Sequence, residues 1–206
     1  LDLMYRSKPE EWSKNALEAV TTLFSQTASD ERLEVYIREI LFAYVESILE
    51  SSKKLPKQVW NALLTAARRP PCFITVLLLP LSTEVSISLK EARVISALVT
   101  KIKLPKDHMN ALLIRICEDV PSPVRTIFVA RLVSKRQALA IQAIDAVVAY
   151  FYNFLNIDEK QPLLWHKALL EFVKSYCIDL QNEQREAIVQ IMQKHRHEQI
   201  DKEIIS

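Results

Sequence analysis

The segment QPLLWHKALLEFVKSY, residues 161–176, carries the pattern that decides the fold. Its apolar side chains recur every three or four residues, which places them on one face of an α-helix. Pro162 stands at the first turn, where a residue without a backbone N–H costs nothing. We therefore predict a helix over 162–178 with Trp165 buried in its apolar face. The stripe consists of Leu164, Trp165, Ala168, Leu169, Phe172, Val173 and Tyr176.

The same helical periodicity runs along the rest of the chain, without the two-residue alternation of strands. Ser88-Leu89-Lys90-Glu91 reads as a capping box, and Ser122 before Pro123 reads as a helix N-cap. The other predicted helices lie near 13–25, 30–50, 56–68, 71–80, 89–102, 106–118, 123–135, 138–155 and 182–195.

Short connections between these helices favour antiparallel packing of neighbours. The sequence therefore predicts an all-α fold of about ten antiparallel helices, in a HEAT-like α-solenoid or a compact helical array. We expect a single domain over 1–206. Because the chain begins at Leu1 without a methionine, we also expect an N-terminal tail of the full protein to precede it.

Glycine is absent from all 206 residues, whereas average usage is about 7%. This excludes P-loops, dinucleotide-binding GxGxxG turns and GxSxG nucleophile elbows, since each needs a backbone without Cβ. The three cysteines include no CxxC pair, so we expect reduced thiols and no zinc ribbon. The longest apolar run, 72–81, is shorter than the roughly 20 residues of a membrane span and contains Pro80.

Residues for catalysis or metal binding are not indicated by any pattern. His166 lies within the apolar stripe and is interpreted as a partly buried histidine with a hydrogen-bond partner. His195 and His197 are two residues apart, so they do not share a helix face as a two-histidine metal site requires. Paired carboxylates and Ser-His-Asp or Cys-His arrangements are also missing. We predict a protein that is not an enzyme, with no catalytic, cofactor-binding or metal-binding residues.

The net charge of +2 conceals a strong asymmetry along the chain. Residues 1–52 carry a net charge of −5, residues 53–136 one of +10 and residues 137–206 one of −3. A basic middle attracts phosphate backbones through counterion release. The alternative is a set of solvated helix faces without a ligand.

Within this basic middle, two groups of cations surround helix connections. One group flanks the connection 102–105, and the other ends a helix and leads into 135–138. Connections two helices apart emerge on the same edge of a helical stack, so we expect the two groups to share one RNA-facing edge. The predicted RNA-binding residues are Lys101, Lys103, Lys106, Arg131, Lys135 and Arg136.

Several segments, in order, resemble the bystin family of small-ribosomal-subunit assembly factors over nearly the whole chain. The strongest is residues 161–176, followed by DLQNEQREAIVQIM and the ending IDKEI. Thr75 and Val76 stand where we expect a Lys-Gly pair in the family, so the chain resembles a divergent member and its helical domain. The remaining similar segments are MYRSKPEEWSKNALEAVTTLF (4–24), RRPPCFITVLLLPL (68–81), SLKEARVISALVTKIKLPKDH (88–108) and SKRQALAIQAIDAVVAYF (134–151).

The resemblance implies a non-catalytic factor in ribosome biogenesis and rRNA processing on the pre-40S particle. The implied partners are precursor small-subunit rRNA, small-subunit ribosomal proteins and other assembly factors, without membrane or cofactor. The implied location is the nucleus and nucleolus, with passage to the cytoplasm on pre-ribosomal particles. The alternative from a different class is a helical protein–protein adaptor that does not bind RNA.

Overall fold

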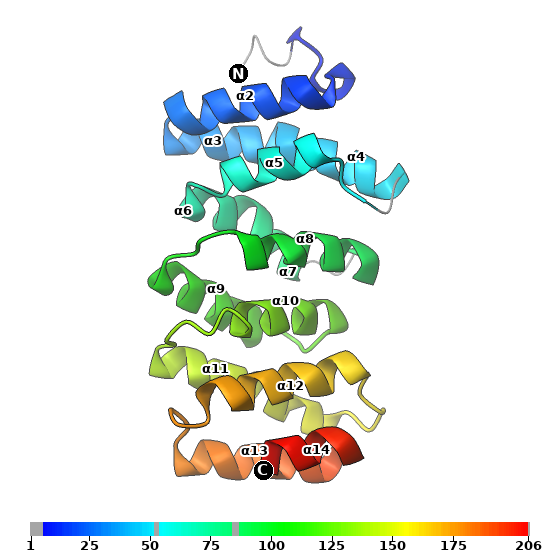
Figure 1. The fold of residues 1–206 in the computed structure, drawn as a ribbon, viewed down its shortest axis with the longest axis vertical. Coiled ribbons are helices and arrows are strands. Elements are labelled where there is room, and N and C mark those ends of the chain that lie inside the picture. Colours follow the sequence, from blue (N-terminus) through cyan, green and yellow to red (C-terminus); the bar gives the residue numbers. More distant parts are fainter. Residues whose placement is uncertain (1–5, 52–53, 84–86, 206) are drawn as a thin grey trace. The chain divides into compact units, whose positions relative to one another are not determined.

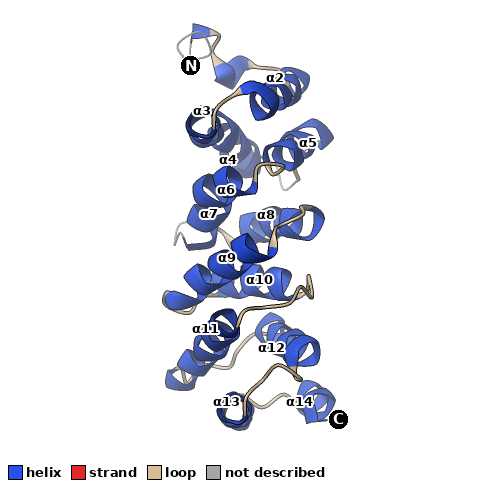
Figure 2. Ribbon diagram, turned by 90° about the vertical axis from the view of Figure 1, so that its left-hand side faces the viewer, coloured by secondary structure: helices blue, strands red, loops and turns tan. Residues whose placement is uncertain are grey.

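A computed structural model describes residues 6–51, 54–83 and 87–205. These residues form helices, turns and connections and no strand, which confirms the predicted all-α class (Figures 1 and 2). The helices gather into two compact units, one ending at His108 and the other beginning at Met109. The expectations of a single domain and of a HEAT-like order stay predictions.

The first unit is built in two layers. In one layer α2 packs on α5, which in turn packs on α8; in the other, the helix that begins with α3 packs on the helix that begins with α6. Figure 2 shows α5 and α8 beside α6 and α7 in this arrangement. The elements are the 3-10 turn Pro9–Glu11, α2 (Lys14–Thr27), α3 (Asp30–Tyr36), a π-helical segment (Ile37–Phe42), α4 (Ala43–Ser51), α5 (Lys57–Ala66), α6 (Pro70–Phe73), a second π-helical segment (Ile74–Leu78), α7 (Leu79–Thr83) and α8 (Leu89–Lys101).

The second unit repeats the two-layer plan. Here α10 packs on α12 and α12 on α14, while α11 packs on α13. The elements are α9 (Lys106–Glu118), whose first turn belongs to the first unit, α10 (Pro123–Val133), α11 (Ile141–Tyr152), a 3-10 turn (Asn153–Asn156), α12 (Leu163–Tyr176), α13 (Asn182–Lys194) and α14 (Glu198–Ile205).

Each unit contains a buried threonine–tyrosine pair that joins two successive helices. In the first unit, the hydroxyls of Thr21 on α2 and Tyr36 on α3 lie 2.7 Å apart. In the second, those of Thr126 on α10 and Tyr150 on α11 lie 2.8 Å apart, and Tyr150 also donates to the carbonyl of Ser122. Both tyrosines are fully buried, so each hydroxyl needs a partner inside the protein.

The local signals predicted from the sequence are present in the structure. Ser88 and Glu91 form the reciprocal capping box of α8, and the Ser122 hydroxyl accepts from the backbone N–H of Arg125 at the start of α10. Trp165 is 1% exposed, which confirms its predicted burial. Its ring lies 5.6 Å from that of Phe151 and 5.4 Å from that of Phe154.

The helices of the structure differ from the predicted ones after residue 138 and again at 198–205. The helix predicted from residue 138 begins at Ile141, because Ala140 is extended and Arg136 has a left-handed φ of 52°. The helix α14, which packs on α12, was not predicted from the sequence. In the described residues no single helix is long and apolar enough to cross a membrane, although Lys57–Ala66 and Pro70–Ser82, bent by 119°, meet the length and composition together.

Candidate nucleic-acid interface

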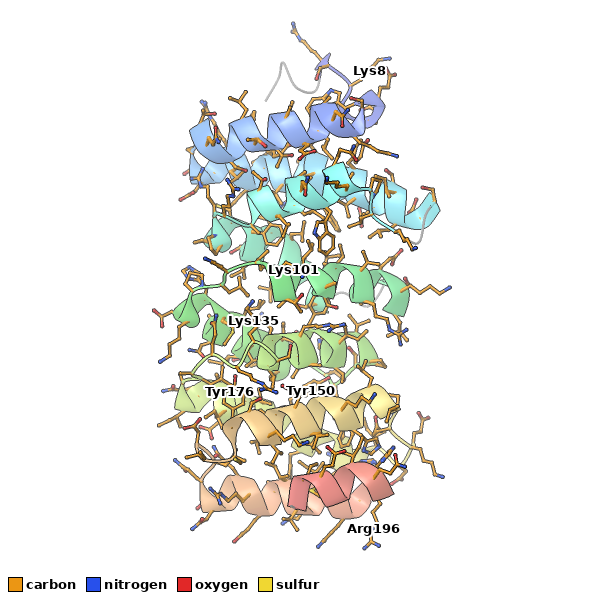
Figure 3. All side chains as sticks on the ribbon, viewed as in Figure 1. Lys8, Lys101, Lys135, Tyr150, Tyr176 and Arg196 are labelled. Atoms are coloured by element: carbon orange, nitrogen blue, oxygen red, sulfur yellow. The ribbon has the colours of Figure 1, made fainter. Side chains whose placement is uncertain are left out.

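The connection that follows α8 projects two lysines in the same direction. Its backbone is extended at Ile102, and successive side chains of an extended chain point to opposite sides. Ile102 and Leu104 are buried, so Lys101 and Lys103 are turned outward together. Lys101 is labelled in Figure 3, at the end of α8. The structure therefore gives two of the predicted residues a common orientation.

Lys101 and Lys103 line a cavity of about 610 Å³ in the first unit, which we call the basic pocket. Arg68, at the end of α5, adds a third cation to its wall. Within the described residues, none of these three cations forms an ion pair. Their charge is available for an anionic ligand, because no carboxylate of the described residues forms an ion pair with them.

The pocket also contains a carboxylate. Glu18 of α2 and Asn61 of α5 lie in its wall, and the Asn61 amide donates to Glu18 Oε1 at 2.9 Å. Both side chains are half-buried. Since α2 packs on α5 and α5 on α8, the two-layer plan of the first unit brings the five polar residues together.

The third predicted lysine of this group, Lys106, is exposed at the first position of α9 and does not line the basic pocket. Lys101, Lys103 and Lys106 belong to the first unit, while Arg131, Lys135 and Arg136 belong to the second. The shared edge of the two groups stays a prediction.

In the second group of predicted residues, Lys135 and Arg136 contact other parts of the second unit, whereas Arg131 is exposed. Arg131 is exposed on α10, and burial lowers the pKa of the half-buried Lys135 ammonium below its usual value. Arg136 donates from Nε and Nη2 to Glu171 Oε1 of α12, at 3.1 and 3.0 Å. The Tyr176 hydroxyl holds the next residue by donating to the carbonyl of Gln137 at 2.9 Å. The positive charge of Arg136 is therefore partly neutralised by α12.

Several other cations of the basic middle form ion pairs within the protein. Arg69 pairs with Asp30, Arg115 with Glu118 at 3.1 Å, and the nearly buried Arg125 with Asp119 at 3.3 Å. These arginines connect or cap helix ends and are not the first choice as phosphate ligands. Lys53, which belongs to the same basic stretch, lies outside the described residues.

Sequence reasoning missed Glu18 and Asn61, and it placed Arg68 only among the general basic residues. The Glu18–Asn61 contact joins positions 43 residues apart, so no local spacing could reveal it. The pattern did give a weak signal for Arg68, which follows the last buried turn of α5, where helix ends expose their side chains.

The histidines form ring contacts in the second unit. His166 is 5% exposed, and its ring lies 4.9 Å from that of Trp165 and 5.0 Å from that of His197. His195 is also buried, and its Nε2 is 2.9 Å from the carbonyl oxygen of Phe154. Among the residues that the structure describes, no group of three or more His, Cys, Asp or Glu side chains could hold a metal ion.

In its described residues the chain is all-helical, with a pocket whose wall holds three cations from α5, α8 and the connections that follow them. The family model for bystin matches residues 1–206, and the chain belongs to the bystin family. It is 31% identical to bystin of Nematostella vectensis over 203 residues, 31% to bystin of Drosophila melanogaster over 202 and 28% to human bystin over 202. These alignments cover 98% of this chain and 47%, 46% and 46% of the three relatives, so the chain spans about half their length.

Proposed function

We propose that this chain is the helical part of a non-catalytic ribosome biogenesis factor. It binds precursor small-subunit rRNA and, through other surfaces, ribosomal proteins and assembly factors. The observation that carries the proposal is the basic pocket, whose wall holds the cations Arg68, Lys101 and Lys103, none of which forms an ion pair in the described residues. Membership of the bystin family supports it.

Binding would depend on phosphate neutralisation by positioned cations. Lysine and arginine near a phosphate release condensed counterions from the RNA, which favours association without reading its sequence. Arg68 can meet a phosphate with two parallel hydrogen bonds, whereas the two lysines act as point charges. Because the lysines are held by the buried Ile102 and Leu104, little conformational freedom of the backbone is lost on binding.

The factor acts in the nucleus and nucleolus on the pre-40S particle and travels with the particle to the cytoplasm. It needs no cofactor, and its role is to hold RNA and proteins in place during rRNA processing.

Crosslinking within native particles tests this function. Full-length protein carrying an affinity tag is purified with its particles, irradiated, and digested so that RNA-linked peptides can be identified. We expect crosslinks to precursor small-subunit rRNA in the peptides that contain Arg68 or the 101–106 segment. Particles without precursor rRNA, or crosslinks confined to other helices, would contradict the proposal.

A second candidate function is a protein–protein adaptor that does not bind RNA. It is favoured by a groove of about 410 Å³ between α11 and α13, lined by Asp145, Glu183 and Glu186, which form no ion pair in the described residues. The exposed ring of Tyr152 borders it. Such a groove suits a lysine- or arginine-rich protein segment. Partner retention after complete ribonuclease digestion, without any RNA crosslink, would put the adaptor first.

A further inference from the structure

The basic pocket holds a carboxylate that a pure phosphate site would not use. Glu18 shares the cavity with Arg68, Lys101 and Lys103, yet among the described residues it pairs with none of them. In the described residues, the hydrogen bond that its carboxylate accepts is the 2.9 Å contact from the Asn61 amide. A negative charge here opposes phosphate binding, so its position calls for a ligand group that donates hydrogen bonds.

An ionised carboxylate can only accept hydrogen bonds, and Asn61 fixes the direction in which Glu18 accepts them. Bases of single-stranded RNA present donors on their Watson–Crick edges. Guanine alone presents two adjacent donors, N1–H and N2–H₂. Adenine and cytosine present one amino group beside an acceptor nitrogen, and uracil presents one N–H between two carbonyls. A carboxylate therefore matches guanine best.

The rest of the pocket matches the remaining features of a guanine nucleotide. Guanine O6 lies beside N1 and is an acceptor that lysine or arginine commonly contacts. The backbone phosphate needs a further cation, and the pocket offers three. Its volume of about 610 Å³ lies within the usual range for a small-molecule site. The half-buried Leu64 gives the wall an apolar surface against which a base can lie.

We propose that the basic pocket binds an unstacked guanine nucleotide of single-stranded RNA. Glu18 accepts from N1–H and N2–H₂, and the cations Arg68, Lys101 and Lys103 meet O6 and the adjoining phosphate. Asn61 is a positioning residue that orients the carboxylate. This inference rests on the proposed RNA-binding function and adds a base preference to it.

The test measures binding of short fluorescent oligouridylates that carry one central guanine, adenine or cytosine. The protein should bind the guanine oligomer about tenfold more tightly than the other two. Glu18→Gln should remove this preference while leaving the adenine and cytosine oligomers bound as tightly or more tightly, because a negative charge is lost. Glu39→Gln is the matched control, since Glu39 is exposed in the same unit and does not line the pocket. It should retain the preference.

Modified oligomers test the same contacts on the unaltered protein, without a variant that could misfold. Replacing the guanine by N1-methylguanine should abolish the preference, and inosine, which lacks the N2 amino group, should lose part of it.

Asn61→Ala should weaken the preference without removing binding. Free guanosine monophosphate is the competitor that distinguishes an isolated nucleotide from one held in RNA, and we expect it to compete poorly.

Loss of the base preference and loss of RNA binding are distinct results of these measurements. Equal binding of all oligomers, or a preference that survives in Glu18→Gln, overturns the guanine site and leaves RNA binding intact. Absence of binding to every oligomer overturns both. Competition by the free mononucleotide at the concentration of the oligomer would reassign the pocket to a soluble nucleotide and contradict the RNA ligand.

Discussion

At the scale of single residues, the burial of Trp165 makes a contribution to stability that one substitution can test. It is fully enclosed by Phe151, Phe154 and His195, whose rings lie 5.3–5.6 Å from its own. Trp165→Ala should lower the free energy of unfolding by about 3–5 kcal/mol through lost burial and a cavity. Leu163→Ala is the control, because Leu163 starts the same helix but is 51% exposed. Urea unfolding of both variants checks this, and equal losses would contradict the burial argument.

Arg136 has a left-handed backbone in a chain without glycine. A side chain with Cβ costs about 1–2 kcal/mol in this conformation, and glycine avoids that cost. The ion pair with Glu171 is exposed at the arginine and contributes at most about 1 kcal/mol. Arg136→Gly should therefore be more stable than Arg136→Ala by about 1 kcal/mol, measured by chemical denaturation. A glycine variant less stable than the alanine variant would show that the backbone is not strained.

At the scale of elements, the threonine–tyrosine pairs predict a loss of stability at alkaline pH. Burial raises the pKa of Tyr36 to about 12, above the value near 10 of an unfolded tyrosine. The folded state therefore keeps a proton that the unfolded chain loses. The contribution of this phenol, about 2–3 kcal/mol, is complete below about pH 10 and disappears as the pH rises through about 12.

Tyr36→Phe should consequently lose less stability between pH 10 and 12 than the unaltered protein, although it is less stable at pH 7 because Thr21 loses its partner. Urea unfolding at a series of pH values measures both effects. Tyr152→Phe changes an exposed tyrosine and should keep the original pH dependence. A Tyr36→Phe profile parallel to that of the parent would refute this account.

Two helices show which buried residues can be predicted from the local sequence pattern and which cannot. Six of the seven residues predicted for the apolar stripe of α12 are buried, because an uninterrupted α-helix keeps its phase; Leu164 is half-buried, and His166 is buried in addition. In the helix predicted near 30–50, a regular α-helix that continues from the buried Ile37 and Leu41 would place Tyr44 on the buried face, but the structure buries Val45 and leaves Tyr44 half-buried. The π-helical segment Ile37–Phe42 inserts an additional residue into one turn and shifts the phase by one position. It packs on the second π-helical segment, Ile74–Leu78, a tertiary contact that no local sequence pattern contains.

At the scale of the whole molecule, the charge asymmetry could be read from the sequence. Which of the cations line the pocket and which form ion pairs could be predicted only in part. The +10 of the basic middle indicated the surface, and the helix connection indicated Lys101 and Lys103. The structure adds that Arg68 joins them, while Arg69, Arg115 and Arg125 are paired within the protein. Pairing depends on which helices pack together, so composition could not separate the two sets of cations.

The salt dependence of RNA binding shows whether the cations of the basic pocket contact phosphates. The double variant Lys101→Glu/Lys103→Glu is compared with the parent and with the control Lys160→Glu/Lys167→Glu, which changes the net charge by the same amount. Lys160 and Lys167 are exposed in the second unit, and neither forms an ion pair in the described residues. Binding to single-stranded precursor rRNA is measured across a salt titration. Each phosphate contact contributes a log–log slope of about −0.7.

We predict that the parent and the control share one steep slope. The pocket variant should bind more weakly at low salt, and its slope should be shallower by about 1–2, because two phosphate contacts are lost. Circular dichroism and thermal melting confirm that the fold is kept, as expected for exposed side chains. A pocket variant that follows the parent's affinity and slope at every salt concentration would contradict the assignment of this pocket to RNA.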